Sequence, residues 1–181
     1  MSTRRAAPTR PLCGGLDRAI QGAQPPLPGA VLEDYYLEHI VLCLSDGLLA
    51  QCGIDLDTHR GEIAAGNLSA LCDCPFVLGS AEDKGGRIGR GLLRSSGVSP
   101  VSKATSENVE TLLALCEQGV GACFCPENLL HTALSPAQLA HLHILPLCSE
   151  ASYPICFGYL SRSYPWSVLS EFIRIAREQT A

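Results

Sequence analysis

The chain has 181 residues, of which 46% are hydrophobic and 17% are charged. This balance excludes a disordered chain, because disordered chains are poor in apolar residues and rich in charge. Thirteen Lys and Arg against eighteen Asp and Glu give a net charge of −5, which argues against a free-standing nucleic-acid-binding domain. The length suits one ordinary domain or two small lobes.

The first fifteen residues carry Arg4, Arg5 and Arg10 but no apolar core of a signal peptide. No stretch of the sequence approaches the ~18 consecutive apolar residues of a membrane-spanning helix. We therefore expect a cytoplasmic protein without membrane contact, in which thiols stay reduced. The ten cysteines are then expected to be small buried hydrophobes rather than a disulfide framework.

Strands and helices alternate along the chain after a tail expected at residues 1–15. Apolar runs predict strands at 16–20, 39–44, 75–78, 100–104, 120–124, 142–145 and 155–159. Helices are expected between Gly85-Gly86, which precede the first of them, and Gly97, from Thr105 or Ser106 to Gly119, and over 126–133, 136–139 and 165–176. Residues 48–73 give no clear signal. The alternation predicts an α/β fold with a largely parallel sheet.

Two helices have a clear apolar face. In the first, the apolar residues stand at i, i+3, i+4 and i+7, namely Val109, Leu112, Leu113 and Cys116. Thr105 or Ser106 is expected as its N-cap, and Gly119 as its C-terminal glycine. The last helix has Ser163 as a possible cap, Pro165 in its first turn, and an apolar stripe of Leu169, Phe172, Ile173 and Ala176.

Catalytic chemistry finds no support in the residue pattern. No local signature of a nucleophile surrounds any Cys or His, and the sequence contains no G-x-S-x-G motif. We therefore expect no catalytic residue and a protein that is not an enzyme.

Metal binding is the next candidate. Cys72-x-Cys74 and Cys123-x-Cys125 each place two thiols on one face if the segment is extended, and His141-x-His143 has the same gap. Structural zinc sites space their cysteines by two to four residues, so these gaps are off-pattern. We expect buried thiols, a surface His pair, no metal and no cofactor. A metal- or redox-responsive module using the Cys-x-Cys pairs is kept as an alternative.

A glycine-rich stretch at residues 85–91 matches neither the dinucleotide-binding nor the P-loop pattern. On a helix, Arg87, Arg90 and Arg94 would line one face. That face is expected to be solvated, and the alternative is a contact with an anion or a partner subunit.

The segment 105–108 stands at the start of the clearest helix. A helix N-terminus offers unpaired N–H groups to an anion, and the Thr105 and Ser106 hydroxyls could add donors. Capping and ligand binding can coexist there, because one hydroxyl is enough for the cap.

A longer motif runs through this helix: Asn108-x-Glu110-Thr111-Leu112-x-x-Leu115-x-x-x-Gly119-x-Gly121-x-x-x-x-Pro126. It resembles a stretch in the effector-binding domain of LysR-type transcriptional regulators. Further similar pieces occur in the family's order: Leu16-Asp17-x-Ala19-Ile20, Leu37-Glu38-x-Ile40-Val41-Leu42, Pro75-Phe76-Val77-Leu78 and the segment 164–173. The resemblance covers residues 16–177.

The resemblance implies a two-lobed fold like that of type 2 periplasmic binding proteins, with lobe I incomplete. The expected division is a tail at 1–15, part of lobe I and a crossover strand at 16–46, lobe II at 47–150, and the return strand and last helix of lobe I at 151–181. Family members begin with a winged helix-turn-helix domain and a linker helix that this sequence does not include. The chain would then be a fragment, carry a misassigned start codon or come from a degenerate gene, and its basic, proline-containing opening would suit a misassigned start.

The function implied is that of an effector-sensing domain, in which two lobes close on a small molecule. By resemblance, the effector-binding residues would be Gln21, Ser80, Thr105, Ser106, Asn108, Phe124, Cys125 and Pro126. An anionic effector is one option, homo-oligomers are expected in the full-length context, and DNA would be bound only through the missing domain. A solute-binding protein of the same fold remains an alternative.

One branch of the family senses peroxide through a cysteine pair in this domain. That pair lies between the strand similar to 75–78 and the helix that starts near Asn108. Residues 79–115 contain no cysteine here, which argues against that mechanism.

Overall fold

The computed structural model describes residues 19–22, 29–160 and 167–179. The chain divides into two compact units, which we call unit 1 (Met1–Tyr36 and Pro154–Ala181) and unit 2 (Leu37–Tyr153). Two strands, β2 (Ala30–Ser45) and β7 (Ser152–Leu160), contribute residues to both units. No helix of the described part is long and apolar enough to cross a membrane.

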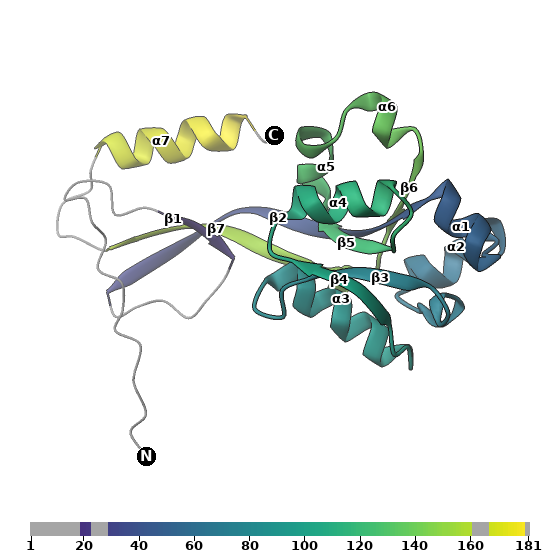
Figure 1. Cartoon of the computed structure of the whole chain (residues 1–181). Coiled ribbons are helices and arrows are strands. Elements are labelled where there is room, and N and C mark those ends of the chain that lie inside the picture. The colour runs from purple at the N-terminus through teal and green to yellow at the C-terminus, as the bar shows by residue number, and fades with distance from the viewer. Residues whose placement is uncertain (1–18, 23–28, 161–166, 180–181) are drawn as a thin grey trace, which may run out of the picture. The chain divides into compact units, whose positions relative to one another are not determined.

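Unit 2 holds most of the secondary structure, as Figure 1 shows. Besides its parts of β2 and β7 it contains, in chain order, α1 (Asp46–Cys52), α2 (Leu56–Ala64), β3 (Pro75–Gly79), α3 (Lys84–Ser95), β4 (Val101–Ser106), α4 (Val109–Glu117), β5 (Cys123–Pro126), α5 (Glu127–Ala133), α6 (Pro136–Leu139) and β6 (Leu142–Pro146). Two short 3₁₀ turns cover Ser69–Leu71 and Ser149–Ala151.

The strands of unit 2 lie in the order β4, β3, β5, β2, β6. β3 and β4 form a two-stranded sheet, and β5, β2 and β6 belong to a second sheet beside it. β3 and β4 are parallel, and a parallel bridge between Phe76 and Ala122 connects β3 to the start of β5. Within unit 2, β2 is antiparallel to β5 and to β6. The expectation of a largely parallel sheet is therefore wrong, because the long strand β2 runs against the strands on either side of it.

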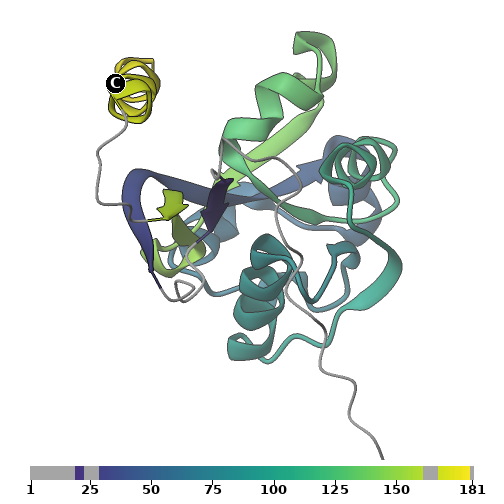
Figure 2. The same ribbon diagram turned by 90° about the vertical axis from the view of Figure 1, so that its left-hand side faces the viewer.

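Helices cover both faces of this sheet (Figures 1 and 2). Leu42 and Leu44 of β2 face one core cluster, which includes Leu93 of α3. Val41 and Cys43 face the other cluster, which includes Leu113 of α4. Because alternate residues of a strand point to opposite faces, the nearly all-apolar sequence of this segment fits a strand covered on both sides, as expected.

Unit 1 contains β1 (Ala19–Gly22), the first part of β2, most of β7 and the helix α7 (Ser167–Glu178). β1 is antiparallel to β7. The ring of Phe157 lies 4.6 Å from that of Tyr35 and 5.9 Å from that of Phe172, measured between centroids. Ile173 is the buried residue of α7, whereas Phe172 is 46% exposed. The predicted caps Ser163 and Pro165 lie outside the described residues.

Several element boundaries differ from those expected. α3 begins at Lys84 and contains the glycines at 85 and 86, because the Asp83 carboxylate accepts a hydrogen bond from the N–H of Gly86 at 2.9 Å and caps the helix. α1 and α2 lie in the stretch without a sequence signal. α2 buries only Leu56 and Ile63, too few residues for a visible apolar face.

Candidate functional site

The carboxyl ends of β3, β4 and β5 lie at one edge of the unit 2 sheet, because these three strands are parallel. Gly79 at the end of β3 is opposite Ser106 at the end of β4. Ser80 follows β3 directly, and Pro126 ends β5. Side chains from three separate parts of the sequence are thus brought to the same edge, which we call the strand-end edge.

The first turn of α4 is capped at this edge. The Asn108 side chain accepts a hydrogen bond from the N–H of Thr111 at 3.0 Å, and the Ser106 hydroxyl oxygen accepts one from the N–H of Asn108 at 3.1 Å. Asn108 is therefore the N-cap, and the prediction of Thr105 or Ser106 in that role is wrong. The Thr105 side chain is exposed, and its hydroxyl has no hydrogen-bond partner among the described residues.

Ser80 is half-buried where β3 leads into α3. Its hydroxyl oxygen accepts a hydrogen bond from the N–H of Glu82 at 3.2 Å. Arg90 reaches back from α3 and donates to the carbonyl oxygen of Gly79 at 2.6 Å. The expectation that Arg90 shares a solvated face with Arg87 and Arg94 is therefore wrong, since its guanidinium holds the end of β3.

Phe124 and Cys125 contribute little side chain to the strand-end edge. Phe124 is 5% exposed and stacks on Phe76 with ring centroids 5.9 Å apart. A Cβ atom at Gly89 would lie only 2.4 Å from the Phe124 ring, so the ring occupies the space that this glycine leaves. Cys125 is fully buried. A ligand at this edge could contact only the backbone of Phe124 and Cys125. Pro126 is partly exposed, so its side chain could also be contacted.

Glu38 is a polar residue that the sequence reasoning did not single out from the residues themselves. It is 3% exposed, and its carboxylate accepts hydrogen bonds from the backbone N–H and the side-chain amide of Asn128 at 3.4 and 3.5 Å. It thereby fixes the first turn of α5 beside Pro126. The sequence signal that could have identified Glu38 is its position directly before the apolar run 39–44. A carboxylate that is buried with such a strand needs hydrogen-bond partners.

Gln21 lies on β1 in unit 1, opposite Cys156 of β7. Its side chain is outside the described part of the chain. The strand-end edge belongs to unit 2, so its geometry does not test the expected role of Gln21 in effector binding.

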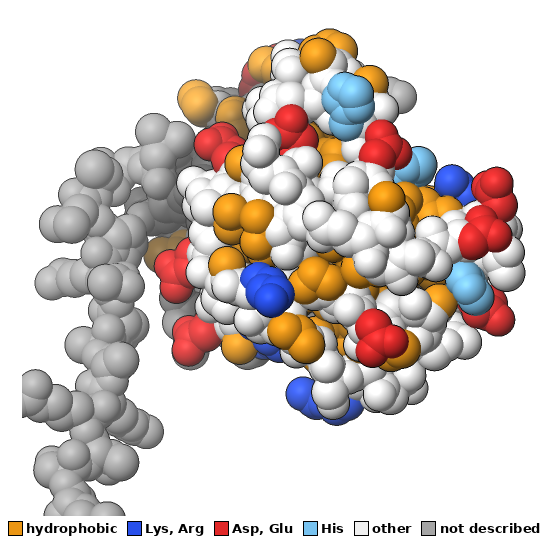
Figure 3. Space-filling model, turned by 45° about the vertical axis from the view of Figure 1, so that its right-hand side comes forward, with side chains coloured by type: hydrophobic (Ala, Val, Ile, Leu, Met, Phe, Trp, Pro, Cys, Tyr) orange, Lys and Arg blue, Asp and Glu red, His pale blue; other side chains and the backbone are white. Residues whose placement is uncertain are grey.

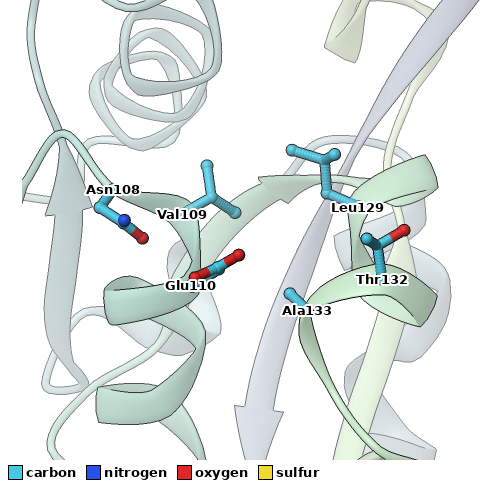
Figure 4. A pocket seen from close by; sticks show the side chains of 6 residues that line it. All are labelled: Asn108, Val109, Glu110, Leu129, Thr132 and Ala133. Atoms are coloured by element: carbon cyan, nitrogen blue, oxygen red, sulfur yellow. The ribbon is translucent and has the colours of Figure 1, made fainter.

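A cavity of about 280 Å³ opens between α4 and α5 and includes the Asn108 side chain (Figure 4). Val109 and Leu129 face each other across it, and the Glu110 carboxylate points toward it. Thr132 and Ala133 complete the lining. The cavity is mainly apolar, with polar side chains at Asn108 and Glu110 on one side and at Thr132 of α5 on the other.

The two Cys-x-Cys pairs differ from each other. Cys123 and Cys125 both lie buried on one face of β5, as expected. Cys72 is exposed and helical in backbone conformation, while Cys74 is buried, so the expectation of one shared face fails for this pair. Within the described residues, no group of three or more His, Cys, Asp and Glu side chains could hold a metal ion.

Burial keeps several thiols protonated. Burial and the neighbouring Cys52 raise the pKa of the Cys74 thiol to about 12. The contact with Cys43, whose sulfur lies 3.6 Å away, and burial raise the pKa of Cys125 well above the ordinary range. Because the thiolate is the reactive form, these groups behave as core side chains.

Comparison with known proteins identifies the family. A family profile described as the LysR substrate binding domain matches residues 3–181. No curated protein sequence matches the chain. The structural neighbours include the regulatory domain of Synechocystis PCC6803 CcmR in complex with 2-PG, at 13% identity and a TM-score of 0.66, covering 91% of this chain and 73% of that one.

Two further neighbours have the same fold. HinK, a LysR family transcriptional regulator from Pseudomonas aeruginosa, is 16% identical with a TM-score of 0.67, over 90% of this chain and 53% of HinK. The effector-binding domain of QuiR in complex with shikimate is 13% identical with a TM-score of 0.62, over 90% of this chain and 71% of that domain. The chain thus spans about half the length of HinK and about seven tenths of the two separate domains.

The architecture is therefore the periplasmic-binding-protein-like α/β fold of effector-binding domains. Because the family profile matches nearly the whole chain, the chain belongs to the LysR substrate binding domain family. Domains of this family are the effector-sensing parts of transcriptional regulators.

Proposed function

We propose that the strand-end edge of unit 2 binds the small-molecule effector of a LysR-type regulator. The observation that carries this proposal is the convergence of Ser80, Ser106 and Asn108 at one edge of the sheet. In open α/β sheets, ligands bind outside the carboxyl ends of parallel strands. Unit 2 then corresponds to lobe II, and unit 1 to part of lobe I.

The ligand-binding groups at this edge are hydroxyl and amide. Thr105 has an unused hydroxyl, and the oxygens of Ser80 and Ser106 each accept one backbone N–H while keeping their own O–H as a donor. The first-turn N–H groups of α4 favour an anionic group on the effector. The cavity between α4 and α5 gives an apolar part of the effector room beside Asn108.

The rest of the proposal concerns the whole regulator. The chain acts as a sensor and not as an enzyme, it works in the cytoplasm as part of a homo-oligomer, and DNA is bound by another domain. Effector binding shifts a conformational equilibrium by its differential affinity for the two states. On the face shown in Figure 3, acidic and basic side chains are scattered and do not form one basic patch, which supports the proposal that this domain does not bind DNA.

The test is a binding screen of small polar molecules, beginning with shikimate and 2-PG, by thermal shift and calorimetry. For any molecule that binds, the double substitution Thr105→Ala, Ser106→Ala should weaken binding by about tenfold, because each lost hydrogen bond is worth roughly 0.5–1.5 kcal/mol. Ser102→Ala, at an exposed position of the same strand, is the matched control. Unchanged affinity in the double variant would remove the strand-end edge as the effector site.

The effector's charge is tested with a matched pair, a bound carboxylate and its amide. Tighter binding of the carboxylate supports the role of the α4 N–H groups. Tighter binding of the amide would show that the site selects a neutral molecule.

A further inference from the structure

Four cysteines meet inside unit 2 and form what we call the thiol cluster. Its members are Cys43 of β2, Cys116 of α4, and Cys123 and Cys125 of β5. All four belong to one hydrophobic cluster of the core, and each is 0% exposed. Figure 1 shows α4 beside the part of the sheet that holds β5 and β2. The fold therefore gathers thiols from three separate parts of the sequence.

Within the thiol cluster, Cys43 and Cys125 form a facing pair. Their sulfur atoms lie 3.6 Å apart, and either thiol can donate a hydrogen bond to the other. In the register of β2 and β5, Cys43 lies opposite Cys123, so Cys125 is its diagonal neighbour. The thiol of Cys116 donates instead to the carbonyl oxygen of Cys43, at 3.2 Å. Two sulfurs on neighbouring strands are thus held close enough to share one ligand.

The neighbouring thiols also change the acidity of this pair. Contacts with Cys123 and Cys125 hold the pKa of the Cys43 thiol well below its usual range, although burial acts in the opposite direction. The contact with Cys43, together with burial, raises the pKa of Cys125. The pair therefore favours a form in which the Cys43 thiolate accepts a hydrogen bond from the Cys125 thiol. In this form one proton is held between two sulfur atoms, and the pair carries one negative charge.

We propose that Cys43 and Cys125 form a two-coordinate binding site for Cu(I), a soft monovalent metal ion. Thiolates are among the ligands that Cu(I) prefers. The ion takes the place of the shared proton, which passes to the solvent, and two sulfur–metal bonds form without transfer of an electron. The charge of the pair is then unchanged, whereas a divalent ion would alter it by one. The inference does not depend on the effector site, because both side chains lie in the core.

The number of ligands distinguishes this site from a zinc or iron–sulfur site. Structural zinc and iron–sulfur clusters are held by four ligands. In the ranges 19–22, 29–160 and 167–179, no three or more His, Cys, Asp and Glu side chains are placed to hold a metal ion together. Two sulfur–metal bonds of about 2.3 Å in line span about 4.6 Å. The sulfurs, now 3.6 Å apart, would therefore separate by about 1 Å or less.

Burial determines how the ion reaches the pair. α4 packs over this part of β2 and β5, so the metal can enter only when the structure opens locally. Binding at the pair is therefore expected to be slow, whereas binding at the exposed thiol of Cys72 needs no opening. A slow phase is thus the kinetic signature of the buried site.

The test uses Ag(I), which has the charge and softness of Cu(I) and is stable in air. The background protein is the full chain, kept reduced with a phosphine, without its more exposed thiols. Cys52, Cys72 and Cys148 are exposed or partly exposed, and Cys13 lies outside the described residues, so all four are replaced by serine. Sulfur-to-silver charge-transfer absorption is followed over time. One equivalent of Ag(I) should bind in a slow phase, and Zn(II) at the same concentration should not bind.

Variants of the background protein locate the site. Cys43→Ala and Cys125→Ala should each weaken binding by more than about 100-fold, because loss of a ligand costs more than loss of an outer partner. Cys74→Ala is the matched control, since it removes a buried thiol of the other hydrophobic cluster and should leave binding unchanged. Equal weakening in all three variants, or none in Cys43→Ala, would overturn the proposal.

A second measurement applies even if an alanine variant fails to fold by circular dichroism. X-ray absorption at the copper edge of the Cu(I)-loaded background protein should show two sulfur ligands and no nitrogen ligand. Three or more ligands, a nitrogen ligand, or a protein that takes up no metal would contradict a two-thiol site.

Discussion

Gly86 and Gly91 lie in the same helix, α3, but their surroundings are opposite. A Cβ atom at Gly86 would lie 2.1 Å from the carbonyl oxygen of Ser80, so the backbone would have to move, whereas one at Gly91 would meet nothing. We expect Gly86→Ala to destabilise the protein by about 1–3 kcal/mol through overpacking. Gly91→Ala should stabilise it by about 0.5–1 kcal/mol through helix propensity.

Urea unfolding followed by circular dichroism measures both changes. The two variants carry the same substitution in the same helix, so each is the control for the other. Similar effects at both positions would contradict the close approach of α3 to the end of β3.

The buried thiol of Cys74 makes stability depend on pH. Its pKa is raised from 9.0 to about 12, mainly by burial, so the folded state holds this proton more tightly than the unfolded state. The stabilisation is complete below the unfolded pKa and is lost as pH rises from about 9 to about 12. The urea midpoint should therefore fall over this alkaline range.

Cys74→Ala should make this alkaline fall shallower, because one of the raised thiols is removed. The exposed Cys72 supplies the control, since Cys72→Ala should leave the slope as it is. An identical pH slope in the wild type and in both variants would contradict the role of Cys74.

At the scale of the element, the start of α4 depends on Asn108. Its side chain accepts the N–H of Thr111, an otherwise unpaired donor of the first turn. Asn108→Ala should cost about 1 kcal/mol of stability. Glu107→Ala, at the exposed neighbouring position, should change stability by less than about 0.5 kcal/mol in urea unfolding. If both variants unfold together with the wild type, the cap contributes nothing.

Helix ends marked by glycine were predictable from the sequence. Gly97 and Gly119 both have positive φ, of 70° and 74°, at the ends where the sequence placed them. A helix end of this kind can be predicted from local sequence, because it requires only that one residue adopt a positive φ. The N-terminus of α4 was predicted two or three residues early, because several hydroxyl and amide residues in a row can all act as caps.

At the scale of the whole molecule, both hydrophobic clusters belong to one continuous segment. All members of both hydrophobic clusters lie between residues 37 and 153, the bounds of unit 2. We therefore expect the fragment 37–153 to fold alone, because it keeps the whole of the buried apolar surface that stabilises these clusters. Its thermal unfolding should be cooperative, with native chemical-shift dispersion in NMR.

A fragment covering unit 2 without its last strand provides the comparison. Removing residues 142–153 deletes β6, which pairs with β2, and should abolish cooperative unfolding. A fragment 37–153 that lacks fixed tertiary structure would show that unit 2 needs unit 1 in order to fold.

Ser80, Ser106 and Asn108, which the resemblance names as effector-binding, lie at the ends of elements, and the structure brings them to one edge of the sheet. The sequence predicted buried thiols, Cys125 among them, but did not decide whether the Phe124 ring points into the core. β5 has only four residues and is covered on both faces. It therefore has no polar residue that would show from the sequence which side chains point to which face.

The sequence by itself determined the order of the elements other than α1 and α2, the buried part of β2 and the glycine-marked helix ends, because each depends on neighbouring residues alone. Only the tertiary structure decided the direction of the strands around β2, the hydrogen bond from Arg90 to the end of β3 and the hydrogen bonds between Glu38 and the first turn of α5. Asn128, which donates hydrogen bonds to Glu38, is 90 residues away in the chain. Such contacts depend on the register between strands, which no local pattern specifies.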